Sequence, residues 1–424
     1  MTLLKSNNNK DFFVRVCSIA IAFWCCIPSL NDILGCIFSK ESSIMALMYI
    51  VASFVFLLLW LYSLIKFESR MPIFTLVFLF LVSSFYFFTY FLGLSNIEPQ
   101  YFFCYFITPL LFFTTFMIEN LIDVKKIIFW ISILPLPAII FERQIFEVDN
   151  RLTISMGTSY NFLTPCLACL VYLTMYLFKE RNRRSIFYLP VAIINTFYLI
   201  QLLRYGSRGP VICMISFIIL VLIIKYDWNK GRIRLSRLKT FVIVGLFVVL
   251  IANFWNILNL LSSYLNSNFL SKMIRLYSEN NVLNNRDVEF GLAFSGIIEK
   301  PIFGHGISSF EYYTGYPYPH NLFLQLLYDG GMVLFFAFMI PMVLLFVQMF
   351  KKCKYNDFVL FTYLFSYAVI KSLVSGNIWE NNKLWILFAL SIAMNFQNSK
   401  STESIQFISD SRGINYANRY FNIS

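Results

Sequence analysis

The chain has 424 residues, of which 58% are apolar and 13% are charged, against about 45–50% and about 25% in an ordinary soluble domain. This composition excludes a soluble enzyme, and 16 Gly and 13 Pro are too few for a collagen-like or low-complexity chain. Nearly uncharged stretches of about 20 residues recur along the whole length. The composition therefore predicts a polytopic helical membrane protein.

The apolar runs, taken in chain order, predict an all-α fold of about twelve transmembrane helices in one membrane-embedded unit, residues 1–424. Polar or charged breaks separate the runs. The expected spans are 16–38, 44–65, 71–94, 99–118, 127–141, 160–178, 186–203, 210–224, 241–261, 332–350, 358–374 and 384–396.

The distribution of Lys and Arg predicts the orientation of these spans. Alternate connections hold 22 basic residues on one side and 11 on the other, out of 34 in the chain. Because basic loops stay in the cytoplasm, both termini are expected there, and residues 397–424 are expected to form a polar cytoplasmic tail. The net charge of +12 is thus mainly a topology signal, and nucleic acid is not expected as a partner.

One connection, residues 262–320, is much longer than the others and is placed on the external side. It contains both His residues of the chain, His305 and His320. Apolar residues between Phe290 and Ile298 predict a short amphipathic helix that lies against the membrane. Long loops of this kind carry function, so the site is expected here.

A first candidate element is the run from Arg204 to Pro210, at an external junction between two spans. A guanidinium near membrane depth costs about 2.5–3.5 kcal/mol on insertion scales and needs an anionic or carbonyl partner. Arg208, supported by Ser207 and with Arg204 nearby, is therefore a candidate phosphate ligand. The alternative is that Arg208 reaches lipid headgroups or pairs with Glu142.

A second candidate is Arg286, which precedes the predicted amphipathic helix. It is a potential anion ligand, or a surface residue paired with Asp287 or Glu289. The carboxylate pairs Asp287/Glu289 and Glu147/Asp149 resemble an Asp-x-Asp metal site. Residues two apart diverge on a helix, so no metal site is predicted.

A third candidate is the run from Tyr318 to Gly331. After Pro319 it predicts a helix that the Gly pair ends. A polar stripe on that helix, expected to line a site or polar cavity, consists of Asn321, Gln325 and Asp329. His320 is expected at the external mouth of this site, although it could instead be a cap or a packing residue. His305, between two glycines, is interpreted as a turn residue.

These elements, in this order, resemble the O-antigen ligase and polymerase family of bacterial polysaccharide enzymes over roughly residues 200–390. The landmarks are Ser207-Arg208-Gly209, Arg286, Lys300-Pro301-Ile302-Phe303-Gly304-His305-Gly306, and His320-Asn321 with Gln325 and Gly330. Two positions depart from the family pattern: Arg204 stands where a neutral residue is expected, and Asp329 where Glu is more usual.

The resemblance implies an enzyme of the bacterial inner membrane with a periplasmic active site. Its donor and acceptor would be undecaprenyl-pyrophosphate-linked glycans, a chain-length regulator protein is a possible partner, and no cofactor is implied. By resemblance, Arg208 and Arg286, with Arg204, would bind pyrophosphate, and His320 would be the catalytic base.

The physical chemistry agrees with that assignment. Two guanidinium groups can stabilise the charge of a departing diphosphate without a metal. The same cations lower the pKa of His320, so that a neutral imidazole can accept a proton from a sugar hydroxyl. Aromatic residues that could stack on sugar rings, or anchor the chain at the interface, are Phe310, Tyr312, Tyr313, Tyr316 and Tyr318.

The expected function is polymerisation of lipid-linked repeat units into O-antigen or capsular polysaccharide. A ligase that transfers the finished glycan to a lipid A core is the near alternative, since it uses the same donor. A lipid-linked oligosaccharide flippase is an alternative of another class; such transporters place polar groups near the bilayer midplane in two related halves.

Overall fold

The structure is a computed structural model that describes most of the chain. The described residues are 2–38, 42–67, 69, 71–139, 156–179, 188–204, 208–227, 232–235, 286–351 and 355–396, with a few single positions between 241 and 279. This part is helical apart from one short antiparallel ribbon, β1 (Ile224–Asp227) and β2 (Arg232–Leu235). The expected helical fold is therefore confirmed for this part of the chain.

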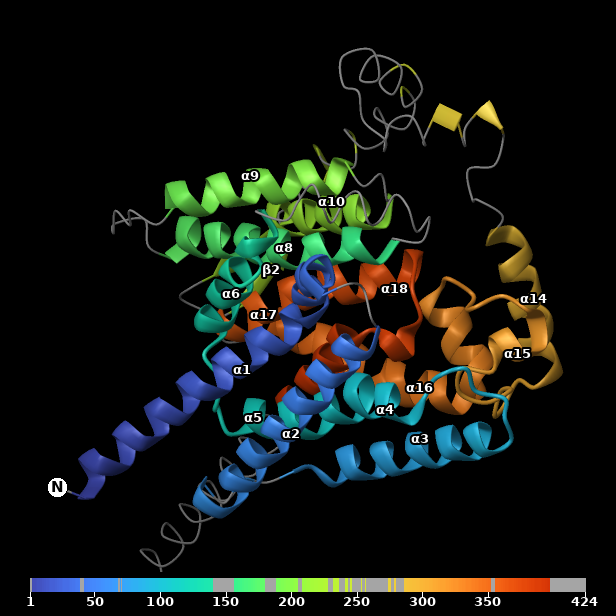
Figure 1. The fold of residues 1–424 in the computed structure, drawn as a ribbon, viewed down its shortest axis with the longest axis horizontal. Coiled ribbons are helices and arrows are strands. Elements are labelled where there is room, and N and C mark those ends of the chain that lie inside the picture. Colours follow the sequence, from blue (N-terminus) through green and yellow to red (C-terminus); the bar gives the residue numbers. More distant parts are fainter. Residues whose placement is uncertain are drawn as a thin grey trace, which may run out of the picture.

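The N-terminal third forms four long apolar segments. They are α1 (Thr2–Phe38), α2 (Ser42–Phe67), α3 (Ile73–Phe91) and a continuous helical stretch from α4 (Pro99–Phe102) through two π-helical turns to α5 (Thr114–Ile118). Pro99 begins α4 because a helix's first N–H has no intrahelical partner. In Figure 1 these helices occupy the lower part of the molecule.

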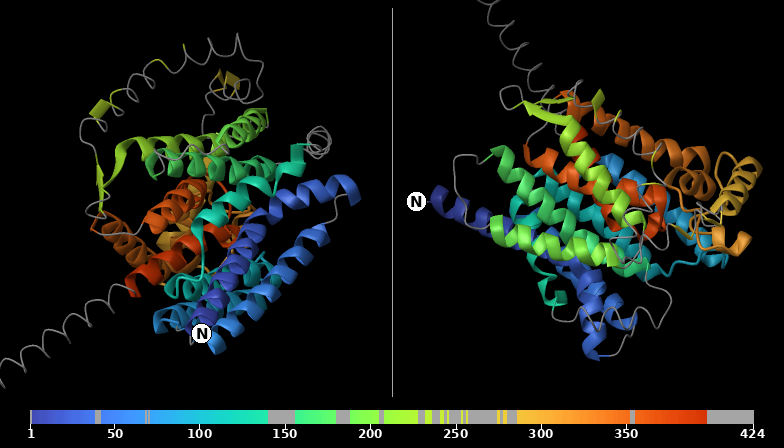
Figure 2. Two further views of the ribbon diagram at one scale, coloured as in Figure 1. Left: turned by 90° about the vertical axis from the view of Figure 1, so that its left-hand side faces the viewer. Right: turned by 90° about the horizontal axis from the view of Figure 1, so that it is seen from above.

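A second group of helices covers the opposite side. It consists of α6 (Val124–Ile133), α8 (Met156–Lys179), α9 (Tyr188–Arg204) and α10 (Arg208–Ile223). Asp123 caps α6 by accepting hydrogen bonds from the amides of Lys125 and Lys126. Figure 2 shows α8, α9 and α10 grouped beside the C-terminal helices, against which α8 and α10 pack.

The C-terminal helices lie between these groups. They are α16 (Leu322–Lys351), α17 (Tyr355–Leu364), α18 (Ile370–Val374) after a π-helical turn, and the apolar helix Asn382–Phe396. A 3-10 turn, Ile378–Glu380, connects the last two. Its Trp379 stacks on Trp385 with 5.3 Å between ring centroids, and both side chains are fully buried. The core thus reaches the turn that leads into the last helix.

The number of spans is only partly supported. Six described helices are long and apolar enough to cross a membrane: Lys10–Asn31, Leu47–Phe67, Ile73–Phe91, Pro99–Ile118, Leu322–Gln348 and Asp357–Val374. Four predicted spans coincide with shorter apolar helices: Tyr160–Met175, Leu189–Leu202, Arg208–Leu222 and Asn382–Phe396. The predicted span 127–141 is a 10-residue helix, α6, followed by a 3-10 turn. The span 241–261 and the tail 397–424 lie outside the described residues.

The structure describes the predicted long loop, residues 262–320, continuously from Arg286 onward. Residues Arg286–Glu299 form α14, which begins before the predicted Phe290, and Phe310–Thr314 form α15. The expected helix is present. Phe290, Ala293 and Ile297 pack in a small core with Phe310, Leu324 and Tyr328, whereas Phe294 and Ile298 are exposed. Figure 1 shows α14 and α15 at one end of α16.

Helix α16 starts where the sequence predicts and breaks at Gly331, although it does not end there. Gly331 has φ +60°, and the chain continues as helix to Lys351. The segment 301–306 crosses this break: the amides of His305 and Gly306 donate to the carbonyls of Tyr328 and Asp329, and the amide of Met332 donates to Pro301. The motif from Lys300 to Gly306 therefore holds α14 to the kink.

Candidate functional site

His320 stands directly before α16 and is largely buried beside α14. Its Nε2 lies 3.6 Å from Oε2 of Glu289, a buried residue one helical turn after Arg286. Both atoms are inside the protein, and His320 Nδ1 is buried without a hydrogen-bond partner among the described residues. A proton on Nε2 that faces the carboxylate would leave Nδ1 with a free lone pair.

Burial is the main cause of the lowered pKa of His320, which is about 4, and the positive charge of Arg286 acts in the same direction. The sequence reasoning named only the cations, so burial is the larger cause that it omitted. Burial likewise raises the pKa of Glu289, while Arg286 opposes that shift. The imidazole is therefore uncharged at neutral pH.

Arg286 is fixed at the first turn of α14. Its Nη1 donates a hydrogen bond to the carbonyl of Val374, the last residue of α18. The charge of Arg208 at the start of α10 lies close enough to that of Arg286 for the two to repel. Three chain segments that are far apart in sequence thus bring Arg208, Arg286 and His320 into one region.

Gly209 allows the start of α10 to reach this region. A Cβ at Gly209 would lie 1.8 Å from the hydroxyl oxygen of Tyr160 in α8, so no larger residue fits without displacing that ring. The close approach places the backbone of Gly209 against the Tyr160 ring. It gives a packing reason for the Gly in the motif Ser207-Arg208-Gly209.

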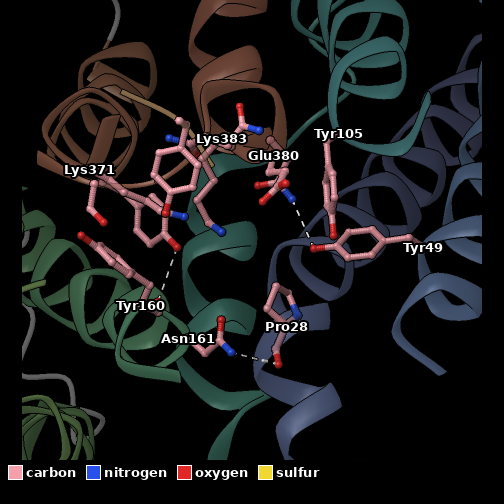
Figure 3. Close-up of a pocket in the computed structure, with 15 residues that line it drawn as sticks. Pro28, Tyr49, Tyr105, Tyr160, Asn161, Lys371, Glu380 and Lys383 are labelled. Carbon is pink, nitrogen blue, oxygen red and sulfur yellow. Dashed lines mark hydrogen bonds between the residues drawn. The ribbon is translucent and has the colours of Figure 1, made fainter. Parts of the chain in front are cut away.

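Figure 3 shows a cavity of about 300 Å³ that reaches this cluster through Tyr318. Tyr318 forms part of its wall, and the Tyr318 and His320 rings lie 4.4 Å apart between centroids. The other walls come from α1, α2, the Pro99–Ile118 segment, α8 and the residues from 367 to 383. The remaining lining residues are Pro28, Tyr49, Tyr105, Tyr160, Asn161, Tyr367, Lys371, Ser375, Gly376, Asn377, Glu380, Asn381, Asn382 and Lys383.

Two lysines carry positive charge into the cavity. The ammonium of Lys371 lies 4.9 Å from the centroid of the Tyr160 ring, and that of Lys383 lies 4.3 Å from the centroid of Tyr367. Lys383 is 2% exposed. Glu380 lines the same cavity; burial raises its pKa, and Lys371 opposes the shift. Cation–π contacts of this kind partly replace lost hydration.

The predicted polar stripe on α16 does not line this cavity. Asn321 is the cap of α16, since its Oδ1 accepts hydrogen bonds from the amides of Phe323 and Leu324. Gln325 donates to Asn377 Oδ1 at 2.7 Å and accepts from the amide of Ile378 at 3.0 Å. Asp329 accepts from Trp379 Nε1 at 2.6 Å.

The stripe therefore holds the turn that follows α18, and through Asn377 it supports one cavity wall. His305 has a structural position, as the sequence suggests: its Nε2 donates to the carbonyl of Gly296 at 2.9 Å, and its ring stacks on Tyr328.

Other predicted residues fall elsewhere. Ser207 and the side chain of Arg204 lie outside the described residues, as do Glu142, Glu147 and Asp149. Of the aromatic group, Phe310 is in the small core, whereas Tyr312, Tyr313 and Tyr316 are exposed. Asp287 is exposed while Glu289 is buried, so this carboxylate pair diverges. Within the described part of the chain, no group of three His, Cys, Asp or Glu gathers to hold a metal.

Sequence reasoning missed Glu289 as the partner of His320 and missed the cavity lysines. Glu289 lies three residues after Arg286, a spacing that puts both on one helix face, and this signal was available. In the sequence, Lys371 and Lys383 were used only to predict the orientation of the spans, because no local pattern shows that they share a cavity.

Comparisons with known proteins agree with the resemblance. Residues 195–339 match the family model described as O-Antigen ligase. The matched segment contains Arg208, Arg286, Glu289 and His320, while Lys371 and Lys383 follow it. Comparisons with curated proteins and with solved structures found no match. Residues 195–339 are thus similar to the O-antigen ligase family, which is consistent with an O-antigen ligase or polymerase.

Proposed function

We propose that this protein is a glycosyltransferase of the bacterial inner membrane that polymerises undecaprenyl-pyrophosphate-linked repeat units into O-antigen or capsular polysaccharide. The observation that carries the proposal is the convergence of two arginines and an uncharged histidine beside a cavity lined with tyrosines and asparagines. The family match supports an enzyme that acts on lipid-linked glycans.

The arginines bind the pyrophosphate of the donor. When the bond between the anomeric carbon and the diphosphate oxygen breaks, negative charge develops on that oxygen. Arg286 is held in place by Val374, so its guanidinium needs little reorganisation, and Arg208 adds a second positive charge. The cost of holding these like charges close together falls when a diphosphate binds between them.

His320 acts as the base. Glu289 orients the ring through Nε2, and Nδ1 accepts the proton of the attacking sugar hydroxyl as its oxygen forms the new bond to the anomeric carbon. Glu289 is a positioning residue: its carboxylate favours one tautomer and stabilises the imidazolium that forms. A positioned base of this kind contributes roughly 10²–10⁴-fold to the rate.

Transfer to a lipid A core is the second candidate, because the description of the matched family names a ligase. Both reactions use the same donor and the same leaving group. Only the acceptor separates them, and it could bind at the cavity beside Tyr318 in either case.

The discriminating experiment supplies the purified protein with a lipid-linked repeat unit alone. A polymerase produces a ladder of longer lipid-linked glycans on a gel, whereas a ligase leaves the substrate unchanged until a lipid A core acceptor is added. His320→Ala is expected to abolish the ladder. Ladder formation that is unchanged in Arg208→Ala and also in Arg286→Ala would contradict the assigned pyrophosphate site.

A further inference from the structure

The cavity beside Tyr318 carries positive charge that the proposed reaction does not use. Arg208 and Arg286, which are assigned to the diphosphate, are not among its lining residues, whereas Lys371 and Lys383 are. Among the residues that the structure describes, neither ammonium has a carboxylate within ion-pair distance, and both contact tyrosine rings. Lys383 is nearly fully buried, so its charge is costly without an anionic ligand.

The remaining lining suits a sugar ring. Tyrosine rings present flat apolar faces on which the C–H face of a pyranose can stack, and asparagine amides offer paired donors and acceptors for vicinal hydroxyls. Both residue types recur around the cavity, whose volume of about 300 Å³ lies at the lower end of small-molecule sites. It is therefore a space for one or two sugar rings.

We propose that this cavity is a glycosyl subsite for a sugar that carries a carboxylate, which Lys371 and Lys383 bind while the tyrosines stack on the ring. The site's position, one tyrosine ring from His320, places the acidic sugar next to the reacting centre. In its link to catalysis the inference rests on the proposed function, and it names the substrate class as an acidic glycan. Glu380 at the same cavity can accept hydrogen bonds from hydroxyls of the sugar.

The test measures binding to the full chain in lipid nanodiscs by isothermal titration. Methyl glucuronide is the probe, and methyl glucoside, which differs in lacking the carboxylate, is its neutral match. Wild-type protein is expected to bind the glucuronide at least about tenfold more tightly, because a charge-assisted contact exceeds a neutral one. Lys371→Gln and Lys383→Gln should each remove that preference and leave glucoside binding unchanged.

Two further variants serve as controls. Lys383→Arg keeps the charge and should keep a preference for the glucuronide, and it remains informative if Lys383→Gln fails to fold. Lys126→Gln removes a lysine that pairs with Asp123 away from the cavity, and it should behave as wild type.

Inorganic pyrophosphate is the second probe, because the lysines could bind the diphosphate of the donor and not the carboxylate of a sugar. If pyrophosphate binding, and not glucuronide binding, depends on the lysines, they serve the donor diphosphate and the proposal is wrong. Equal affinity of the wild type for glucuronide and glucoside would also overturn it. Binding that depends on the lysines in a protein that forms no ladder would retain the acidic-sugar site and reject the polymerase. If the protein forms a ladder but its glucuronide binding does not depend on the lysines, the polymerase is retained and the acidic-sugar site is rejected.

Discussion

In the proposed mechanism Glu289 orients the ring of His320, from which it lies 3.6 Å away, and this pair gives a test at the scale of one residue. Glu289→Gln keeps the shape of the side chain and removes its charge, so the imidazole loses its preference for one tautomer and the imidazolium loses its counter-charge. We expect kcat to fall at least about tenfold with little change in KM. The measurement is the initial rate of ladder formation.

The control for this substitution is Asp287→Asn on the same helix. Asp287 is exposed, so its loss should leave the rate near that of wild type. A Glu289→Gln enzyme with wild-type kcat would remove Glu289 from the mechanism and leave His320 without a positioning partner.

The lowered pKa of His320 predicts the pH dependence of the reaction. Because the pKa of His320 in the folded protein is about 4, below the ordinary value of 6.5 for a histidine, its imidazole stays uncharged as the pH falls through 6.5. We expect kcat/KM to stay constant as the pH is lowered from neutral, and to fall only near pH 4, where His320 becomes protonated. A pH–rate profile checks this, and a midpoint near 6.5 would show a solvated imidazole.

Arg286→Gln tests the second cause of the same shift. It removes the neighbouring positive charge, so the remaining activity should show an acidic limb displaced to higher pH. The displacement should be partial, since burial is the larger cause. An unchanged midpoint would mean that the charge of Arg286 does not act on His320.

The site could be predicted from sequence only where its residues lie in local motifs. Arg208, Arg286 and His320 stand in runs with unusual Gly, Pro and polar content, and the structure brings them together. Lys371 and Lys383 stand at the ends of apolar helices, where basic residues are common. Their shared cavity depends on packing between helices that are distant in the chain, and no local pattern encodes that packing.

The kink of α16 is the element on which the site's scaffold depends. Gly331 has φ +60°, and a Cβ there would lie 2.2 Å from the carbonyl oxygen of Ile302. Gly331→Ala should therefore lower the free energy of unfolding by at least about 2 kcal/mol, because left-handed backbone strain and a backbone clash act together. Thermal unfolding in detergent, followed by circular dichroism, measures the loss.

Gly291→Ala in α14 is the matched control. Gly291 is helical and a Cβ there meets nothing within 4 Å, so the substitution should stabilise the helix by about 0.5–1 kcal/mol. Equal effects of the two substitutions would contradict the structural role of the segment 301–306. The sequence predicts that the helix ends at this Gly pair, whereas the helix continues past the kink. The crossing of the segment 301–306 is a long-range contact that the local pattern does not contain.

At the scale of the whole molecule, the apolar surface agrees with a membrane environment. Large side chains on α2 and α3, such as Phe54, Ile65, Phe80 and Phe88, are more than half exposed, and a soluble monomer rarely exposes so much contiguous apolar area. The length of the apolar runs in the sequence predicted the long helices. It could not give the number of spans, because several described helices are too short to cross the bilayer alone.

The orientation in the membrane remains a prediction from the distribution of basic residues, and it can be tested with introduced cysteines. Ser295 on α14 and Asp11 near the start of α1 are both exposed. If α14 is periplasmic and the N-terminus cytoplasmic, a thiol reagent that reaches the periplasm but does not cross the inner membrane should label Ser295→Cys in cells. The same reagent should label Asp11→Cys only after the inner membrane is permeabilised. Seven native cysteines are free and buried, so a parent protein in which Cys36 and Cys353 are replaced by Ser should give a low background. Labelling of Asp11→Cys alone before permeabilisation would invert the topology and place His320 on the cytoplasmic side, where donor glycans would have to be presented before export.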